Sequence, residues 1–407
     1  MRTLWLVVLG LAAAIFASPA AAATGQLRTL YVQATWGPVP FMQADLERVA
    51  RETDAYFQAS SSGRLSMPGS VATPIQLRRA AFDNCDATVL RNEAPAAMFE
   101  GFDRLLFVTP RVANCPFAGE ANPTEVLLNG ALYRNLAAHE LGHTLTLDHA
   151  SRWVCSGNGC SVQEYGGPFS VMGSGGGDLN AFEKSRLGWL TGLVRPRGSG
   201  TYEIGPIEGP TARPQALVVT TAASEFWFES RGLQTPSFVG SSVQPPGVSV
   251  VAGPAVGGGD ASSPFPRDNL LLANPSGGGR YAFAGGESFV RPGIFRLTVA
   301  RHAPEAAALK FRWLDRLAPG RPRVRGRSVR RGRARIEWDA PRERGSGIET
   351  YTLLVDGRAR RTVGRDVIYI SGGINFRLPR GRHRLGVLAT DRAGNRGQAS
   401  WLRVRVK

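Results

Sequence analysis

Three of the five histidines in this 407-residue chain lie within eleven consecutive residues, from His139 to His149. His139 and His143 are four residues apart, so on an α-helix their imidazoles lie on one face and can bind the same ion. Glu140 lies beside them and can take a proton from a water molecule on that ion. The segment therefore predicts a zinc site with its own general base. The alternative is a buried helix whose histidines only satisfy hydrogen bonds. In that case the four-residue spacing and the adjacent glutamate would be coincidences.

A third protein ligand has to come from outside the helix, because two histidines leave the coordination shell of zinc open. On a straight helix, His149 would lie about 9 Å beyond His143 and would point away from it. The chain must therefore leave the helix and fold back if His149 is to join the site. Asp148, Glu164 and Glu183 are the alternatives for the third position, and Glu183 would give a site of two histidines and one glutamate.

The N-terminus predicts an export signal. It has Arg2, an apolar run at residues 4–17 and the stretch Ala20-Ala21-Ala22-Ala23, which fits a cleavage site. The apolar run is shorter than the roughly 20 residues that span a bilayer, which argues against a membrane anchor. No later segment is long and apolar enough to span. We therefore expect a secreted, released protein after removal of residues 1–23.

Export permits disulfides, and all four cysteines lie in the first half of the chain. Cys155 and Cys160 enclose Ser-Gly-Asn-Gly, a sequence that favours a turn, so we expect them to pair. Cys85 and Cys115 then pair by exclusion. A zinc site built from all four cysteines is the alternative, but the chain lacks the two C-x-x-C motifs of such sites.

Positive charge is concentrated at the C-terminal end. Residues 321–407 contain 23 of the 49 lysines and arginines but only 7 of the 32 aspartates and glutamates, a net charge of +16 against +17 for the whole chain. Such a surface favours salt-dependent association with polyanions, which for an exported protein include cell-wall polymers, acidic polysaccharides and anionic membranes. A solvated basic face without a partner is the alternative.

The first half of the chain predicts strands and helices in alternation. We expect strands at residues 27–35, 65–71, 103–109 and 125–128, helices at residues 43–59 and from about residue 132, and a short helix at residues 180–189 with Asp178 as its N-terminal cap. The strand at residues 125–128 could form a sheet edge and pair with an extended peptide.

The second half predicts only β-structure. Short apolar runs suggest strands at residues 216–220, 226–229, 248–251 and 295–300, and then at residues 334–338, 349–355, 367–370, 375–378, 383–389 and 400–406. The loop at residues 253–269 is rich in Gly, Pro and Ser and predicts no regular structure. After the linker Pro319-Gly320-Arg321-Pro322, the strand spacing is typical of a β-sandwich. Residues 345–351 and 389–395 resemble turns of fibronectin type III or immunoglobulin-like modules.

Residues 165–173, with the sequence YGGPFSVMG, resemble the methionine turn of the metzincin proteases. The metzincin motif H-E-x-x-H-x-x-G-x-x-H also has its third histidine at the spacing of His149. With Cys115 and the Leu187-Gly188-Trp189 segment, residues 26–190 resemble the gametolysin family of secreted metzincins. The resemblance implies that the three histidines bind Zn²⁺, that Glu140 is the catalytic base, and that Met172 lies beneath the metal without binding it.

Thr146 departs from the family pattern, because it occupies the position of the motif's glycine. If that position requires a left-handed backbone, a β-branched residue is disfavoured there. The turn that brings His149 back would then differ from the family's turn or carry strain.

The expected fold class is multidomain, with an α+β metzincin-like catalytic domain, a small all-β domain and a C-terminal β-sandwich. The expected boundaries are 1–23 for the signal peptide, 24–193 for the catalytic domain, 194–316 for the β-rich domain and 317–407 for the basic fibronectin-like module. The expected function is a secreted zinc metalloendopeptidase acting on protein or peptide substrates. A zinc hydrolase of cell-wall peptides and a catalytically silent surface-binding protein are the alternatives.

The partners expected besides the substrate are anionic cell-surface polymers, which residues 317–407 could bind. The chain shows no dedicated nucleic-acid motif and, once the signal is removed, no membrane anchor. We expect a monomer.

Overall fold

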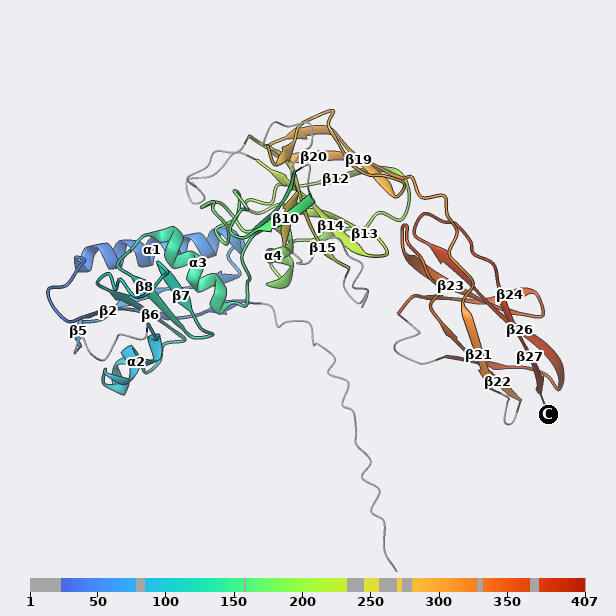
Figure 1. The fold of residues 1–407 in the computed structure, drawn as a ribbon, viewed down its shortest axis with the longest axis horizontal. Coiled ribbons are helices and arrows are strands. Elements are labelled where there is room, and N and C mark those ends of the chain that lie inside the picture. The colour runs from blue at the N-terminus through green and yellow to red at the C-terminus, as the bar shows by residue number, and fades with distance from the viewer. Residues whose placement is uncertain are drawn as a thin grey trace, which may run out of the picture.

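The computed structural model describes residues 23–77, 85–156, 159–232, 245–255, 269–272, 280–327, 332–366 and 373–406. Most of the regular secondary structure of these residues is β-strand, arranged as several sheets in three groups that follow the chain order (Figure 1). The export signal expected at residues 1–23 lies outside the described residues except for its last position, and the strand expected at residues 367–370 lies wholly outside them. None of the helices described has the length and apolar composition that crossing a membrane requires.

The first group is a sheet of mainly parallel strands. Its strands are β2 (Thr29–Thr35), β4 (Gly69–Val71), β5 (Ile75–Gln76), β6 (Arg104–Thr109), β7 (Gly119–Ala121) and β8 (Glu125–Asn129), beside a small pair of β1 (Gly25–Gln26) and β3 (Leu65–Ser66). The order is β4-β2-β6-β8-β7, and β7 is antiparallel to β8. The prediction that residues 125–128 form a sheet edge is wrong, because β7 pairs with β8 and is itself the edge strand.

Helices lie on both faces of this sheet (Figure 1). The helices α1 (Gln43–Ser60) and α3 (Arg134–Thr144) pack on one face, in a core that includes Tyr31, Leu46 and Leu141. The short helix α2 (Ala87–Asn92) and the 3₁₀ turn Ala96–Phe99 belong to the opposite face, whose core includes Val32 and Phe107. Alternate residues of β2 thus face opposite cores, as the two-residue period of a strand requires.

The second group contains two sheets around one aromatic-rich core. The larger sheet has the order β10-β9-β16-β15-β14-β13-β11, with β17 paired to β15, and the smaller has the order β12-β20-β19-β18. The strands are β9 (Ser151–Ser156), β10 (Gly159–Gln163), β11 (Leu193–Val194), β12 (Gly200–Ile204), β13 (Ala216–Thr220), β14 (Ser224–Arg231), β15 (Gly247–Pro254), β16 (Leu270–Leu272), β17 (Ala282–Phe283), β18 (Ser288–Arg291), β19 (Phe295–Ala303) and β20 (Ala306–Trp313).

The larger sheet joins residues from both sides of the boundary expected at residue 193. The strand β9 begins two residues after His149 and pairs in parallel with β16, so that Ser151 lies opposite Leu270. The segment with the histidines is therefore attached to the second group by a continuous sheet. The division into domains at residue 193 stays a prediction.

The short helix α4 (Ala181–Arg186) begins with a different cap from the expected one. Asn180 accepts a hydrogen bond from the Glu183 amide at 2.9 Å, and the Glu183 carboxylate accepts one from the Asn180 amide at 2.7 Å. Asp178 is buried and binds the Lys184 ammonium at 2.5 Å instead. The prediction of Asp178 as the cap is therefore wrong, because this carboxylate neutralises a buried lysine.

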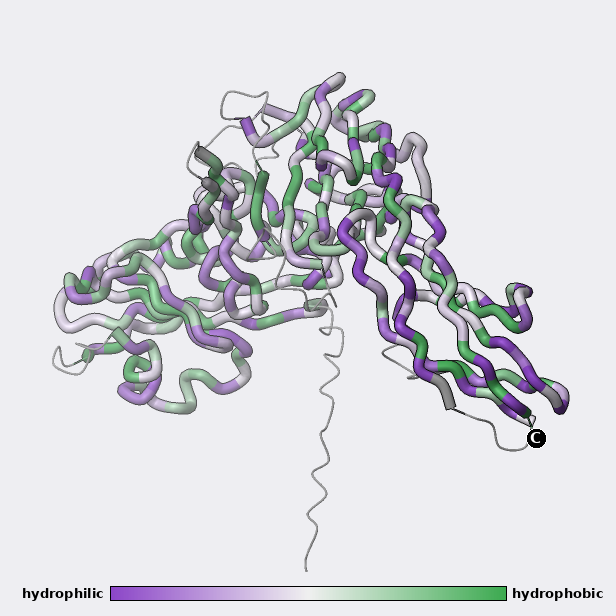
Figure 2. Tube along the Cα trace, turned by 45° about the vertical axis from the view of Figure 1, so that its right-hand side comes forward, coloured by the Kyte–Doolittle hydropathy of each residue, from purple (hydrophilic) through white to green (hydrophobic). Residues whose placement is uncertain are grey.

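The third group is a pair of sheets packed around one core. The first sheet has the order β21-β22-β25 and the second β24-β23-β26-β27, from β21 (Arg323–Arg327), β22 (Arg333–Asp339), β23 (Ile348–Val355), β24 (Arg358–Gly364), β25 (Ile374–Arg377), β26 (Gly381–Asp391) and β27 (Ser400–Val406). Hydrophobic and hydrophilic residues alternate along these strands (Figure 2). Inward-facing residues such as Trp338, Tyr351 and Leu385 form the core between the sheets.

Candidate metal centre

Three imidazoles converge at the end of α3. The helix places His139 and His143 one turn apart, and their Nε2 atoms lie 3.1 Å from each other. His149 returns to the same place, so that one ring nitrogen from each histidine lies within 4.8 Å of the others. Among the described residues this is the one group of three or more His, Cys, Asp or Glu side chains that could hold a metal ion.

Each of the three rings uses its Nδ1 atom to bind an oxygen. His139 Nδ1 donates to the Val171 carbonyl at 2.8 Å, and His143 Nδ1 donates to the Leu147 carbonyl at 2.7 Å. His149 Nδ1 lies 2.8 Å from the Glu164 carboxylate. Because a carbonyl oxygen can only accept, the Nδ1 atoms of His139 and His143 carry the protons, and their Nε2 lone pairs remain available to a metal.

The turn after α3 explains how His149 reaches the site. Thr146 has a φ of 68°, in the left-handed region, and its amide donates to the His143 carbonyl at 2.9 Å. Leu147 donates to the Gly142 carbonyl at 3.2 Å, which completes the reversal. The position of the metzincin glycine thus has left-handed backbone here, with a threonine in place of the glycine.

Replacing this threonine by glycine is expected to stabilise the protein. Left-handed backbone costs a residue with a Cβ about 1–2 kcal/mol, and the greater freedom of glycine in the unfolded chain offsets part of that gain. Thr146→Gly should therefore raise the free energy of unfolding by about 0.5–1 kcal/mol, measured by urea denaturation. A lower free energy of unfolding would show that the Thr146 side chain stabilises the turn by more than its backbone costs.

Glu140 is buried next to the histidines, with 5% of its surface exposed. A Cβ at Gly119 would overlap the Glu140 carboxyl group, so the glycine of β7 makes room for this side chain. Burial, helped by the charge of Glu120, raises the pKa of Glu140 to about 8. Burial likewise lowers the pKa of His139 to about 4, and it lowers the pKa of His143, so both imidazoles are neutral at neutral pH.

Met172 packs beneath the histidine helix. It is fully buried, and a Cβ at Gly142 would lie 2.5 Å from its Sδ atom. Its carbonyl accepts a hydrogen bond from Ala150 at 2.8 Å, and its amide donates to Ser170 Oγ at 3.1 Å. Met172 and its neighbours in residues 165–173, the methionine segment, therefore contact both α3 and the chain that follows His149.

Glu183 supports the site from outside and lies apart from the three histidines. Its carboxylate accepts hydrogen bonds from Ser170 Oγ at 2.8 Å and from the Asn269 side chain at 3.0 Å. The Asn269 side chain also donates to the His149 carbonyl at 3.3 Å. The backbone carbonyl of Asn269 accepts a hydrogen bond from the Ser151 amide at 3.2 Å. These contacts connect the methionine segment, α4 and the third histidine.

Of the other two alternatives to His149, one lies at the site and one does not. Glu164 contacts His149 directly, as described above. Asp148 has 77% of its side chain exposed and lies 3.8 Å from Arg186.

Two residues contact His149 although the sequence analysis assigned neither of them a role at the site. Asn269 lies in the Gly/Pro/Ser-rich segment for which we expected no structure. The Tyr165 ring lies 3.9 Å, centroid to centroid, from His149, and Tyr165 has a φ of 58°. A tyrosine in a left-handed conformation is uncommon, but that conformation cannot be seen in the sequence.

Both expected disulfides are present in the structure. Cys85 bonds to Cys115, and Cys155 bonds to Cys160. The second pair links residues that lie opposite each other in the hairpin of β9 and β10. The first ties the segment before α2 to the loop before β7.

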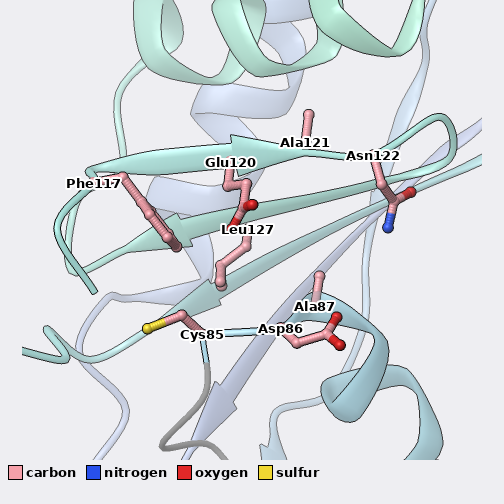
Figure 3. Close-up of a pocket in the computed structure, with 8 residues that line it drawn as sticks. All are labelled: Cys85, Asp86, Ala87, Phe117, Glu120, Ala121, Asn122 and Leu127. Carbon is pink, nitrogen blue, oxygen red and sulfur yellow. The ribbon is translucent and has the colours of Figure 1, made fainter. Parts of the chain in front are cut away.

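A pocket of about 360 Å³ lies on the face of β7 opposite Glu140 (Figure 3). Gly119 and Glu120 are neighbours in a strand, so they face opposite sides of the sheet, and Glu120 points into the pocket. The lining residues are Cys85, Asp86, Ala87, Phe117, Glu120, Ala121, Asn122 and Leu127. The exposed edge of the sheet thus separates the histidine site from an acidic pocket.

The family model of the gametolysin peptidases, M11, matches residues 13–222 of the chain. No curated protein sequence matches the chain. Among solved structures, archaemetzincin from Methanopyrus kandleri is similar at 20% identity over 30% of this chain and 76% of that one, with a TM-score of 0.22. The fibronectin(III)-like modules of Clostridium thermocellum CbhA are similar at 15% identity over 21% of this chain and 95% of theirs, with a TM-score of 0.18. The Clostridium perfringens spore cortex lytic enzyme is similar at 17% identity and a TM-score of 0.20, over 25% of this chain and 33% of that one.

Proposed function

Because this chain belongs to the gametolysin peptidase family, we propose that it is a secreted, zinc-dependent endopeptidase. The observation that carries the proposal is the convergence of His139, His143 and His149 beside the buried carboxyl group of Glu140. The family supports metallopeptidase activity. The zinc ion, the role of Glu140 and secretion are proposals about this chain.

The donor set fits zinc. His139, His143 and His149 would hold the ion, because their Nδ1 atoms are bound to oxygens and the rings of His139 and His143 are neutral at neutral pH. Bound zinc lowers the pKa of a water molecule to about 7 and polarises the scissile carbonyl. Met172 would support α3 from beneath the site.

The chain's own catalytic step belongs to Glu140. Its carboxylate takes the proton of the attacking water and then gives it to the leaving amine of the cleaved peptide. Its contact with Gly119 and its burial hold the carboxyl group in one place, and a fixed proton acceptor is what this step requires. Peptide hydrolysis is then balanced, since water supplies a hydroxyl group to the carbonyl carbon and a proton to the nitrogen.

The edge strand β7 offers a place for an extended substrate. The backbone of Ala118 and of Asn122 bonds to β8, so the amide and carbonyl groups of Gly119 and Ala121 point toward the open edge. A peptide paired there would pass beside Glu140, whose carboxyl group contacts Gly119. This arrangement supports a polypeptide substrate bound in an extended conformation.

The remaining regions have supporting roles in this proposal. Residues 1–23 would direct export, and residues 24–193 would form the metzincin-like catalytic domain. Residues 194–316 would stabilise it through the larger sheet of the second group, which contains β9. Residues 317–407 would hold the enzyme near anionic polymers at a cell surface. The proposed enzyme acts as a monomer.

The proposal is tested with the purified chain lacking residues 1–23 and casein as substrate. Cleavage is expected to stop after treatment with a zinc chelator and to return when zinc is added. Metal analysis should give about one zinc per chain in the active protein. A folded protein that holds zinc and cleaves no protein substrate would contradict the endopeptidase assignment, and cleavage of cell-wall peptides alone would support the narrower hydrolase.

Removing the Asn269 side chain is expected to weaken metal binding. Asn269 holds the backbone of His149 and the carboxylate of Glu183, and loss of such supporting contacts typically lowers metal affinity by about 10–100-fold. Asn269→Ala should show this loss when the protein competes with a chelator for zinc. Asn375→Ala, at an exposed position of β25, is the matched control. Equal zinc affinity in both variants would show that Asn269 does not support the site.

A further inference from the structure

We propose that β26 and β27 bind a linear phosphodiester polymer of the poly(glycerol phosphate) type on the outer face of their four-stranded sheet. The four residues that define this arginine face are Arg382, Arg384, Arg403 and Arg405. The inference names the partner of the anchoring role given above to residues 317–407. It does not depend on the metal centre.

The strand register brings the four arginines together. Arg382 lies directly opposite Arg405, and Arg384 lies directly opposite Arg403. The alternate residues of the same strands, such as Leu385 and Val404, point into the core, so the arginines point outward, and all four are exposed. The result is a two-by-two array with spacings of about 7 Å along each strand and about 5 Å across it.

The arrangement works against the stability of the sheet. Like charges directly opposite each other on neighbouring strands are destabilising. Within the described part of the chain, no carboxylate pairs with Arg382, Arg403 or Arg405. On the opposite sheet, by contrast, Arg325 pairs with Asp339, and Arg335 pairs with Glu337. The arginine face is therefore a concentrated positive charge that an external anion can neutralise.

Trp401 fixes one member of the array. The Arg384 guanidinium lies over the Trp401 ring at 4.7 Å from its centroid, and the ring occupies the place where a Cβ of Gly386 would be, 2.7 Å from its nearest carbons. A guanidinium held in this way loses less freedom when it binds an anion. The site is thus partly ordered before the ligand arrives.

The chemistry of the face favours phosphodiesters in series. A guanidinium donates two parallel hydrogen bonds to a phosphate, and arginines repeated along a strand suit a chain of regularly spaced phosphates. Single-stranded nucleic acid also has such a backbone, but its binding sites add free aromatic rings on which bases stack. Trp401 is the exposed large aromatic residue here, and its ring is already packed against Gly386 and Arg384. The face therefore fits a phosphodiester chain without bases.

The test measures binding of the full chain to immobilised poly(glycerol phosphate), single-stranded DNA and neutral dextran at several salt concentrations. The unmodified protein should bind poly(glycerol phosphate) best, with an affinity that falls as salt rises. Arg403→Glu combined with Arg405→Glu should lower that affinity by about tenfold or more at 0.15 M salt. Both substitutions create opposite-charge pairs across the strands, so the melting temperature should stay equal or rise.

The matched control is Arg333→Glu combined with Arg377→Glu. These two arginines also lie directly opposite each other, on the outer face of the other sheet, so the change in net charge is identical. Equal loss of binding in both double variants would overturn the proposal, since net charge alone would then explain binding. Absence of binding to poly(glycerol phosphate), or tighter binding to DNA, would also overturn it. Casein cleavage measured on the same samples shows separately whether the proposed peptidase function holds.

Discussion

Glu140→Gln is expected to lower kcat/KM for peptide cleavage by about 10²- to 10⁴-fold, which is the usual contribution of a well-placed general base. Glutamine has nearly the same shape as glutamate, so it should keep the contact with Gly119 and leave the fold and the three histidines in place. The amide cannot accept the proton of the attacking water. The loss should therefore appear in kcat, with zinc content unchanged.

The measurement compares cleavage rates and zinc content of Glu140→Gln with those of the unmodified chain. Glu93→Gln removes an exposed carboxylate at the end of α2 and serves as the control, with full activity expected. Cleavage by Glu140→Gln at the normal rate would exclude Glu140 as the base. The other carboxylate at the site is that of Glu164, 2.8 Å from His149, and it would then be the residue to replace.

The local part of the site could be predicted from the sequence because its information is local. A four-residue spacing on a helix is enough to place His139 beside His143. The left-handed backbone at Thr146 could be posed as a question from the sequence, and its answer required the structure. The roles of these residues stay predictions, whereas the family is confirmed by the match over residues 13–222.

The long-range part of the fold could not be predicted, because it depends on pairings between distant segments. Asn269 reaches His149 across 120 residues, from a segment whose composition suggests a loop. The strand β7 is three residues long and gives no period-2 signal, yet it covers β8. Asp178 and Asn180 are both good helix caps, and the buried Lys184 determines which of them is free to cap α4.

Lys184→Met is expected to lower the free energy of unfolding by about 3–5 kcal/mol, the usual cost of breaking a buried ion pair. The Lys184 ammonium is 1% exposed and binds the Asp178 carboxylate at 2.5 Å and the Ile207 carbonyl at 2.8 Å. Asp178 also accepts a hydrogen bond from Ser60, at the end of α1, at 2.5 Å. The pair therefore connects the first sheet group to the second.

The pH dependence of this loss follows from the carboxylate that is left behind. Burial raises the pKa of Asp178 already in the intact protein, and removal of the ammonium raises it further. A raised folded-state pKa favours the folded chain when the group is protonated, so the destabilisation by Lys184→Met should shrink as the pH falls toward the ordinary range of an aspartate. The measurement is the first urea transition at pH 7 and at pH 4.5.

The control Arg48→Met breaks exposed, solvent-screened pairs with Asp45 and Glu52, so its free energy of unfolding should stay close to that of the unmodified chain. Adding Asp178→Asn to Lys184→Met should restore most of the stability at pH 7, because the chain then has no buried carboxylate at position 178 that lacks its lysine partner. A double variant as unstable as Lys184→Met alone would show that the lost stability comes from packing of the lysine chain and not from its charge.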